Sequence, residues 1–184
     1  MPDETVSYLI QPSNESTFTL EVFKTGLLAG KKHFLFFEDY SGEINYNPQQ
    51  PEASSVRFSV EARSVTCKDT WVKPAHKKDI VAMALDDMMA ASQYPKLIFV
   101  SSRIRSTSKG QYEIQGMLTV RGITQPITFQ AAVKPVGDLR LEIDGDAQIS
   151  LKSYGLKAPS KFGGLIGTKD QMLLRFLVWA EKKS

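Results

Sequence analysis

The amino-acid sequence predicts an all-β protein with one inserted helix, and three observations lead to that fold class. Apolar and polar residues alternate with a period of two along much of the 184-residue chain, which is typical of strands with one buried face. Short turn signals separate the alternating stretches. One segment lacks the alternation and repeats its apolar residues at helical spacing. About eight such strands must close into an antiparallel barrel or pair as a sandwich, because open sheet edges invite aggregation.

The predicted strands occupy both halves of the chain, before and after the helical segment. Each has apolar residues on one face and mostly polar residues between them, so we expect antiparallel pairing with one wet face. The apolar faces are Phe18, Leu20 and Val22; Val56, Phe58, Val60 and Ala62; Tyr112, Ile114, Leu118 and Val120; and Ile127, Phe129, Ala131 and Val133.

The longest strand is predicted over residues 139–151, LRLEIDGDAQISL. Its thirteen residues alternate strictly, which a period of 3.6 residues does not produce. Four sites between strands have the composition of tight turns. They are Ser41-Gly42, Ser108-Lys109-Gly110, Arg121-Gly122 and Gly137-Asp138.

A single helix is predicted over residues 77–91, KKDIVAMALDDMMAA. Ile80, Ala84 and Met88 recur at intervals of four residues, and prolines bound the segment at Pro74 and Pro95. One helix inserted into a strand series is a lid or plug and not the crossover of a parallel sheet.

Composition narrows the classes of function. Hydrophobic residues make up 42% and charged residues 23%, and the net charge of +3 is too small to indicate nucleic-acid binding. One cysteine, Cys67, excludes an internal disulfide and a cysteine-rich zinc module. No linker divides the chain, so we expect one domain over residues 1–184. The opening residues show no secretory signal, so we expect a cytoplasmic location.

Several strings resemble the YceI-like family, the lipocalin-like lipid-binding domain of bacteria. The most specific is YEIQGMLTVRGITQPITFQ at residues 112–130, which matches the family's Gly-x-Leu-Thr-x-x-Gly-x-Thr-x-Pro-x-x-Phe pattern. The others are residues 37–65, residues 93–104 and residues 154–180, so the resemblance extends over about residues 5–181. It implies a lipocalin-like antiparallel barrel of about eight strands around a long apolar cavity that binds isoprenoid, isoprenoid-quinone or fatty-acyl chains.

Eleven apolar side chains are predicted to line that cavity. In a barrel of about eight strands the interior is just wide enough to be filled by side chains or to hold one slim ligand. An ordinary packed core is therefore the alternative. The predicted residues are Phe18, Leu20, Phe34, Phe36, Phe58, Phe99, Ile114, Phe129, Leu141, Ile143 and Phe176.

A glycine-rich loop after the longest strand is predicted to form the cavity mouth. Its lysines would attract an anionic head group, and its apolar residues would contact a membrane transiently. The alternative is a solvated loop with solubilising lysines. The predicted mouth residues are His33, Lys152, Lys157, Lys161, Leu165 and Ile166.

No catalytic residue, metal site or cofactor is predicted. His33 and His76 lie in no metal-spaced string, and Cys67 has no designed base beside it. Asp144 and Asp146 share the wet strand face, where nothing would raise the pKa of one of them. The sequence thus predicts a carrier or store of a long-chain lipid, with no nucleic-acid partner and with a homodimer as one arrangement. A filled-barrel scaffold is the second hypothesis and an enzyme acting on a lipid-like substrate the third.

Overall fold

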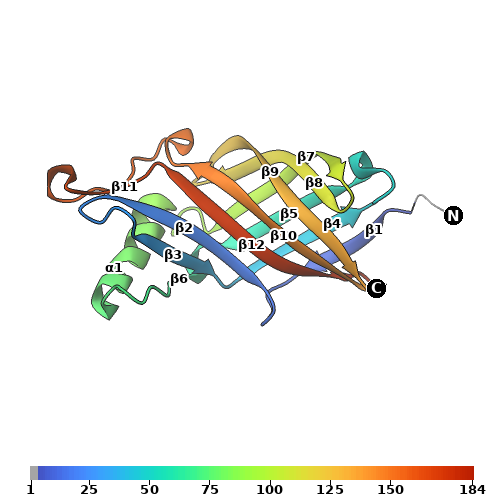
Figure 1. The fold of residues 1–184 in the computed structure, drawn as a ribbon, viewed down its shortest axis with the longest axis horizontal. Coiled ribbons are helices and arrows are strands. Elements are labelled where there is room, and N and C mark those ends of the chain that lie inside the picture. Colours follow the sequence, from blue (N-terminus) through green and yellow to red (C-terminus); the bar gives the residue numbers. More distant parts are fainter. Residues whose placement is uncertain (1–3) are drawn as a thin grey trace.

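Twelve strands form one antiparallel sheet in residues 4–184, the part of the chain that this computed structural model describes (Figure 1). The strands are β1 (Val6–Ile10), β2 (Thr17–Gly26), β3 (Lys32–Phe37), β4 (Tyr40–Tyr46), β5 (Ser55–Glu61), β6 (Val65–Cys67), β7 (Lys96–Ser108), β8 (Gln111–Val120), β9 (Ile123–Val136), β10 (Arg140–Ser150), β11 (Ile166–Thr168) and β12 (Gln171–Lys182). Short 3₁₀ turns lie at Pro51–Ala53, Ala62–Ser64, Lys152–Tyr154 and Phe162–Gly164.

Eight of these strands close into a barrel, which confirms the predicted fold class. The ring runs β1-β4-β5-β7-β8-β9-β10-β12 and returns to β1. Closure depends on β12, because its C-terminal end pairs with β1 while its N-terminal half pairs with β2. Strands β2, β3 and β6 therefore branch away from the ring, and β11 adds to the end of β2.

The alternating faces lie as the sequence predicts in most strands. In β10, Leu141, Ile143 and Ala147 are buried, while Asp144 and Asp146 are exposed. Leu139 departs from its predicted buried face, because it lies in the β9–β10 turn, where it is 65% exposed.

The face predicted for β3 is wrong. Phe34 and Phe36 lie on the outer surface of the barrel, under the ammonium groups of Lys32 and Lys68 at 4.9 and 4.8 Å. Leu35 and Phe37 are the buried residues. The cause is register: Leu20 on the inner face of β2 is paired with Leu35, and paired residues share a face.

Three of the four predicted turns are confirmed, and the one at Ser41-Gly42 is wrong. Both residues lie inside β4, paired with Ser59 and Phe58 of β5. A β-carbon on Gly42 would come within 2.7 Å of the Phe58 ring. Glycine is needed here because a side chain lies close to the backbone. In sequence, such a glycine looks the same as the glycine of a turn.

The helix begins slightly before its predicted start. α1 spans Pro74–Met83 and continues as a π-helical turn over Ala84–Met88. The predicted stripe of Ile80, Ala84 and Met88 faces the barrel interior. No helix in residues 4–184 has the length and apolar character needed to cross a membrane.

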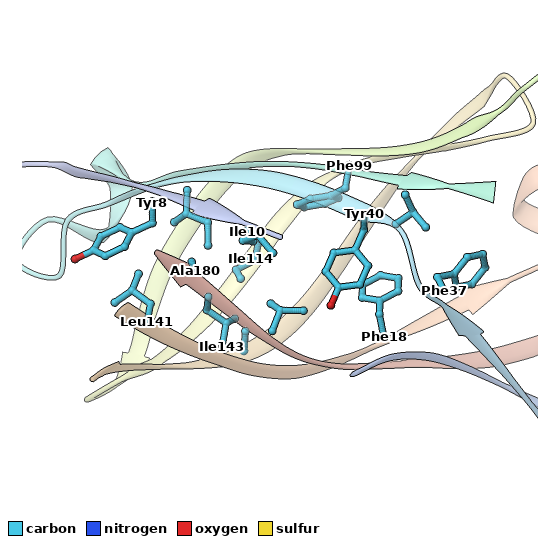
Figure 2. Packing of buried hydrophobic residues seen from close by; sticks show 14 of the residues in the cluster. Tyr8, Ile10, Phe18, Phe37, Tyr40, Phe99, Ile114, Leu141, Ile143 and Ala180 are labelled. Carbon is cyan, nitrogen blue, oxygen red and sulfur yellow. The ribbon is translucent and has the colours of Figure 1, made fainter. Parts of the chain in front are cut away.

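Side chains fill one end of the barrel, where Tyr8, Leu141 and Ala180 lie close together in Figure 2. Tyr8, Tyr46 and Tyr112 are buried there, with the Tyr46 and Tyr112 hydroxyls 3.0 Å apart, and burial raises the pKa of Tyr46. Leu141 and Ala180 are completely buried in the same region. The opposite end carries α1, β11 and the β2–β3 hairpin (Figure 1).

Gly116 in β8 offers a test of this packing. A β-carbon there would lie 2.5 Å from both the Phe99 ring and the Val100 carbonyl oxygen. We expect Gly116→Ala to lower the free energy of unfolding by about 1–3 kcal/mol, the usual cost of overpacking. Urea denaturation measures it, and Thr128→Ala serves as control because it changes an exposed side chain of β9. A Gly116→Ala protein as stable as the wild type would contradict the packing.

Candidate functional site

The barrel encloses an elongated apolar cavity of about 610 Å³. Its wall is built from the inward faces of the strands and from α1. Five aromatic side chains form a connected group across it: Phe18 contacts Phe58 and Phe176, and Phe129 contacts Phe99 and Phe176, with ring centroids 5.2–6.2 Å apart. The cavity volume lies in the range of ligand pockets.

The charged and histidine side chains that line the cavity gather at one end, which we call the mouth. They come from the end of β2, the start of β3, α1 and the loop before β11. These residues are Lys24, His33, His76, Asp79 and Lys161. The remaining lining is almost entirely apolar, so the cavity is an apolar tube with a single polar end.

His33 is held at the mouth by a buried carboxylate. Its Nδ1 lies 2.7 Å from Oδ2 of Asp69, whose side chain is fully buried. Asp69 also accepts hydrogen bonds from the Phe34 backbone N–H at 2.8 Å and from the Cys67 thiol at 3.3 Å. The His33 ring stacks on Trp71 at 5.1 Å. Because Asp69 engages Nδ1, Nε2 is the His33 nitrogen available to a ligand in the cavity.

Two lysines form the other side of the mouth. Lys24 Nζ donates to Thr168 Oγ1 at 3.2 Å, and Lys161 lies close enough to affect its titration. Burial, followed by the positive charge of Lys161, lowers the pKa of Lys24. Neither lysine has a carboxylate partner within ion-pair distance among residues 4–184. An anion bound between them would relieve this repulsion.

The residues predicted to line the cavity divide into three groups. Phe34 and Phe36 are on the outer surface, and Leu141 is inside the barrel but in its packed end. The residues that line the cavity are Phe18, Leu20, Phe58, Phe99, Ile114, Phe129, Ile143 and Phe176.

The predicted mouth residues divide in the same way. His33, Lys161 and Ile166 line the cavity. Lys152, Lys157 and Leu165 do not line it, because this loop turns their side chains toward solvent, where all three are exposed.

Sequence reasoning missed Lys24 and Asp69. Lys24 continues the inward-facing series Phe18, Leu20 and Val22 of β2. The two-residue alternation therefore could have predicted that Lys24 points into the barrel. Asp69 lies in an irregular segment after β6, where no period indicates which side chains are buried.

The expectation that Cys67 is a plain thiol fits its surroundings. Burial raises the pKa of the Cys67 thiol, and the thiol donates a hydrogen bond to Asp69. Asp144 and Asp146 lie on the exposed outer face of β10, away from the cavity.

A closed antiparallel barrel with an apolar cavity and one polar mouth is the architecture of the lipocalin-like barrels. The family model of the YceI-like domain matches residues 8–178, and the chain belongs to that family.

Solved structures with the same fold include three bacterial proteins. Burkholderia cenocepacia BcnA has a TM-score of 0.73 at 19% identity, over 89% of this chain and 95% of that one. A polyisoprenoid binding domain from Saccharophagus degradans, implicated in plant cell wall breakdown, has a TM-score of 0.69 at 12% identity, over 98% and 100%. The Campylobacter jejuni YCEI protein has a TM-score of 0.63 at 18% identity, over 82% and 85%.

Curated sequence relatives include UPF0312 proteins of Pseudomonas. The protein from Pseudomonas putida strain GB-1 is 28% identical over 128 residues, which are 67% of this chain. The match spans 63% of that relative's length.

The Asp69 network generates a stability prediction. Asp69→Asn removes one acceptor and the negative charge while keeping the shape, so we expect the free energy of unfolding to fall by about 1–3 kcal/mol. Asp146→Asn, at an exposed carboxylate on β10, should change it by less than about 0.5 kcal/mol. Urea denaturation compares the two, and equal effects would contradict a structural role for Asp69.

Proposed function

We propose that the protein binds a long-chain apolar lipid, an isoprenoid, isoprenoid quinone or fatty-acyl derivative, as a carrier or store. The tail lies along the barrel cavity and the polar head group lies at the mouth. The observation that carries this proposal is the distribution of polarity: apolar walls along the cavity, with the charged side chains at one end. A ligand with a long tail and one polar end matches that distribution.

The energetics favour long tails over short ones. Each buried methylene contributes about 0.8 kcal/mol, which is about a fourfold gain in affinity per carbon. The gain ends when the tail reaches the packed end at Tyr46 and Tyr112. Affinity should therefore rise with chain length and then level off.

Relatives supply further support. The Saccharophagus degradans protein of the same fold is described as a polyisoprenoid binding domain, and the family is one of binding domains. The cavity of about 610 Å³ favours a carrier over a filled-barrel scaffold. An enzyme receives less support, because the chain's one thiol, that of Cys67, is hydrogen-bonded to Asp69 and has a raised pKa. The homodimer and the cytoplasmic location stay predictions.

Native mass spectrometry of freshly purified protein, followed by organic extraction, tests the proposal directly. We expect a stoichiometric adduct that extracts as an isoprenoid or acyl lipid. Absence of an adduct, together with no binding of an added fluorescent isoprenoid or fatty acid, would leave the filled-barrel scaffold as the better hypothesis.

The depth of the cavity can be tested at Ala131. This residue lines the cavity near the packed end, where it is paired with Tyr112. Ala131→Phe should shorten the tube, so we expect affinity for a long-tailed fluorescent lipid to fall at least about tenfold while a short-tailed analogue still binds. The adjacent Ala132→Phe places the same ring on the opposite strand face and is the matched control. Equal losses for both tails would contradict this arrangement.

The lysines predict selectivity for the head group. We expect Lys24→Met/Lys161→Met to weaken binding of a carboxylate lipid about tenfold while binding of the alcohol with the same tail is retained. Lys157→Met, in the same loop but outside the cavity, is the control. Because the pKa of Lys24 is lowered from 10.5, the wild type's preference for the anion should decline as the pH rises through that lowered value. Equal weakening of acid and alcohol would contradict an anion site.

A further inference from the structure

The most exposed apolar side chains at the mouth end form a protruding cluster. Leu27, Phe162 and Leu165 are 76%, 74% and 59% exposed. Leu27 lies in the β2–β3 hairpin, and Phe162 and Leu165 lie in the loop before β11, more than a hundred residues later in the chain. Leaving such side chains in water is unfavourable, and a cluster of them marks an interaction surface.

Backbone hydrogen bonds hold the two segments together. The Leu27 N–H donates to the Leu165 carbonyl at 2.9 Å, and Ile166 of β11 is paired with Gly26 of β2. In Figure 1 the hairpin and the β11 loop lie together at the end opposite the C-terminus. We call this region, with Leu27, Phe162 and Leu165 at its surface, the mouth tip.

The mouth tip is strongly basic. Residues 22–33 and 151–169 together hold seven lysines and no aspartate or glutamate. The net charge of the chain is only +3, so the remainder is acidic overall. Beside the hairpin, four lysines line a recess of about 380 Å³: Lys24, Lys31, Lys32 and Lys169. Their positive charge attracts phosphate groups.

We propose that the mouth tip docks on the surface of a bilayer that contains anionic lipids. The apolar cluster is exposed on two segments that also carry the lysines, as in proteins that insert side chains among lipid head groups while basic residues contact lipid phosphates. If the partner were a protein, we would expect the tip to carry both positive and negative side chains or to form a groove. A nucleic acid would be expected to use a series of stacking aromatic residues, whereas two of the three exposed side chains of the cluster are leucines.

The mouth tip is next to the opening of the cavity, so docking would place that opening at the bilayer. Lys161 and Phe162 belong to the tip and also line the cavity, so a docked barrel holds its mouth against the bilayer. This consequence rests on the proposed function: a lipid tail would pass between bilayer and barrel without crossing water. The docking itself rests only on the exposed side chains and the charges.

Vesicle flotation tests the docking with the full chain. One set of vesicles contains phosphatidylcholine alone, and the other contains phosphatidylcholine and phosphatidylglycerol in equal amounts. We expect the wild type to float with the anionic vesicles, to float less at high salt, and to bind the neutral vesicles weakly.

Two double variants separate the apolar and the charged contributions. Leu27→Ser/Leu165→Ser should reduce binding to anionic vesicles about tenfold or more, and Lys31→Gln/Lys169→Gln should reduce it by about fivefold for each lysine. Leu139→Ser/Lys182→Gln changes one exposed leucine and one exposed lysine at the opposite end and should bind like the wild type.

Several results would overturn the docking proposal. They are absence of flotation with either vesicle, an unchanged affinity of Leu27→Ser/Leu165→Ser, and an equal loss in the opposite-end control. Binding of a fluorescent isoprenoid is measured in parallel for the wild type and for Leu27→Ser/Leu165→Ser, whose substituted residues lie outside the cavity lining, and the double variant should keep isoprenoid binding. In the wild type, isoprenoid binding without vesicle binding would refute docking alone, whereas vesicle binding without isoprenoid binding would refute the proposed function alone.

Discussion

The double pairing of β12 is the constraint on which the rest of the structure depends. At its C-terminal end this strand pairs with β1 and closes an eight-stranded ring, and at its N-terminal half it pairs with β2. The ring is narrow enough for tyrosine and leucine side chains to fill. Toward the mouth, β2, β3 and β6 branch away, and α1 joins the wall. One strand thus produces a packed end and an open end.

The chemistry of the site follows from that asymmetry. A charged group in the packed end would lose its hydration with no compensation, and the lining there is apolar. At the mouth, irregular segments and strand ends supply polar partners, and Asp69 obtains three donors despite full burial. Its hydrogen bonds fix His33, whereas neither Lys24 nor Lys161 has a carboxylate within ion-pair distance among residues 4–184. The polar end is therefore held by a hydrogen-bond network on one side and carries the two positive charges of these lysines on the other.

Most of the barrel could be predicted from the sequence, because a two-residue period directly reports which strand face is buried. The prediction failed where the period is absent. The run from His33 to Phe37 is nearly all apolar, and only its register against β2 shows that Leu35 points inward. The Ser41-Gly42 pair looks like a turn in sequence, but Gly42 instead lets the Phe58 ring lie close to the backbone of β4. Asp69 lies between regular elements, where burial depends on tertiary contacts that no local pattern records.

Several departures from packing and charge rules lie at the mouth, which is informative about function. Natural sequences violate packing and charge rules mainly where function requires it. Here Lys24 and Lys161, which have no carboxylate within ion-pair distance among residues 4–184, lie at the same end of the barrel as three exposed apolar side chains. The repulsion between the lysines and the exposure of the apolar side chains are both unfavourable. An anionic, partly apolar surface at this end would relieve both, because it balances the lysines and buries the apolar side chains together.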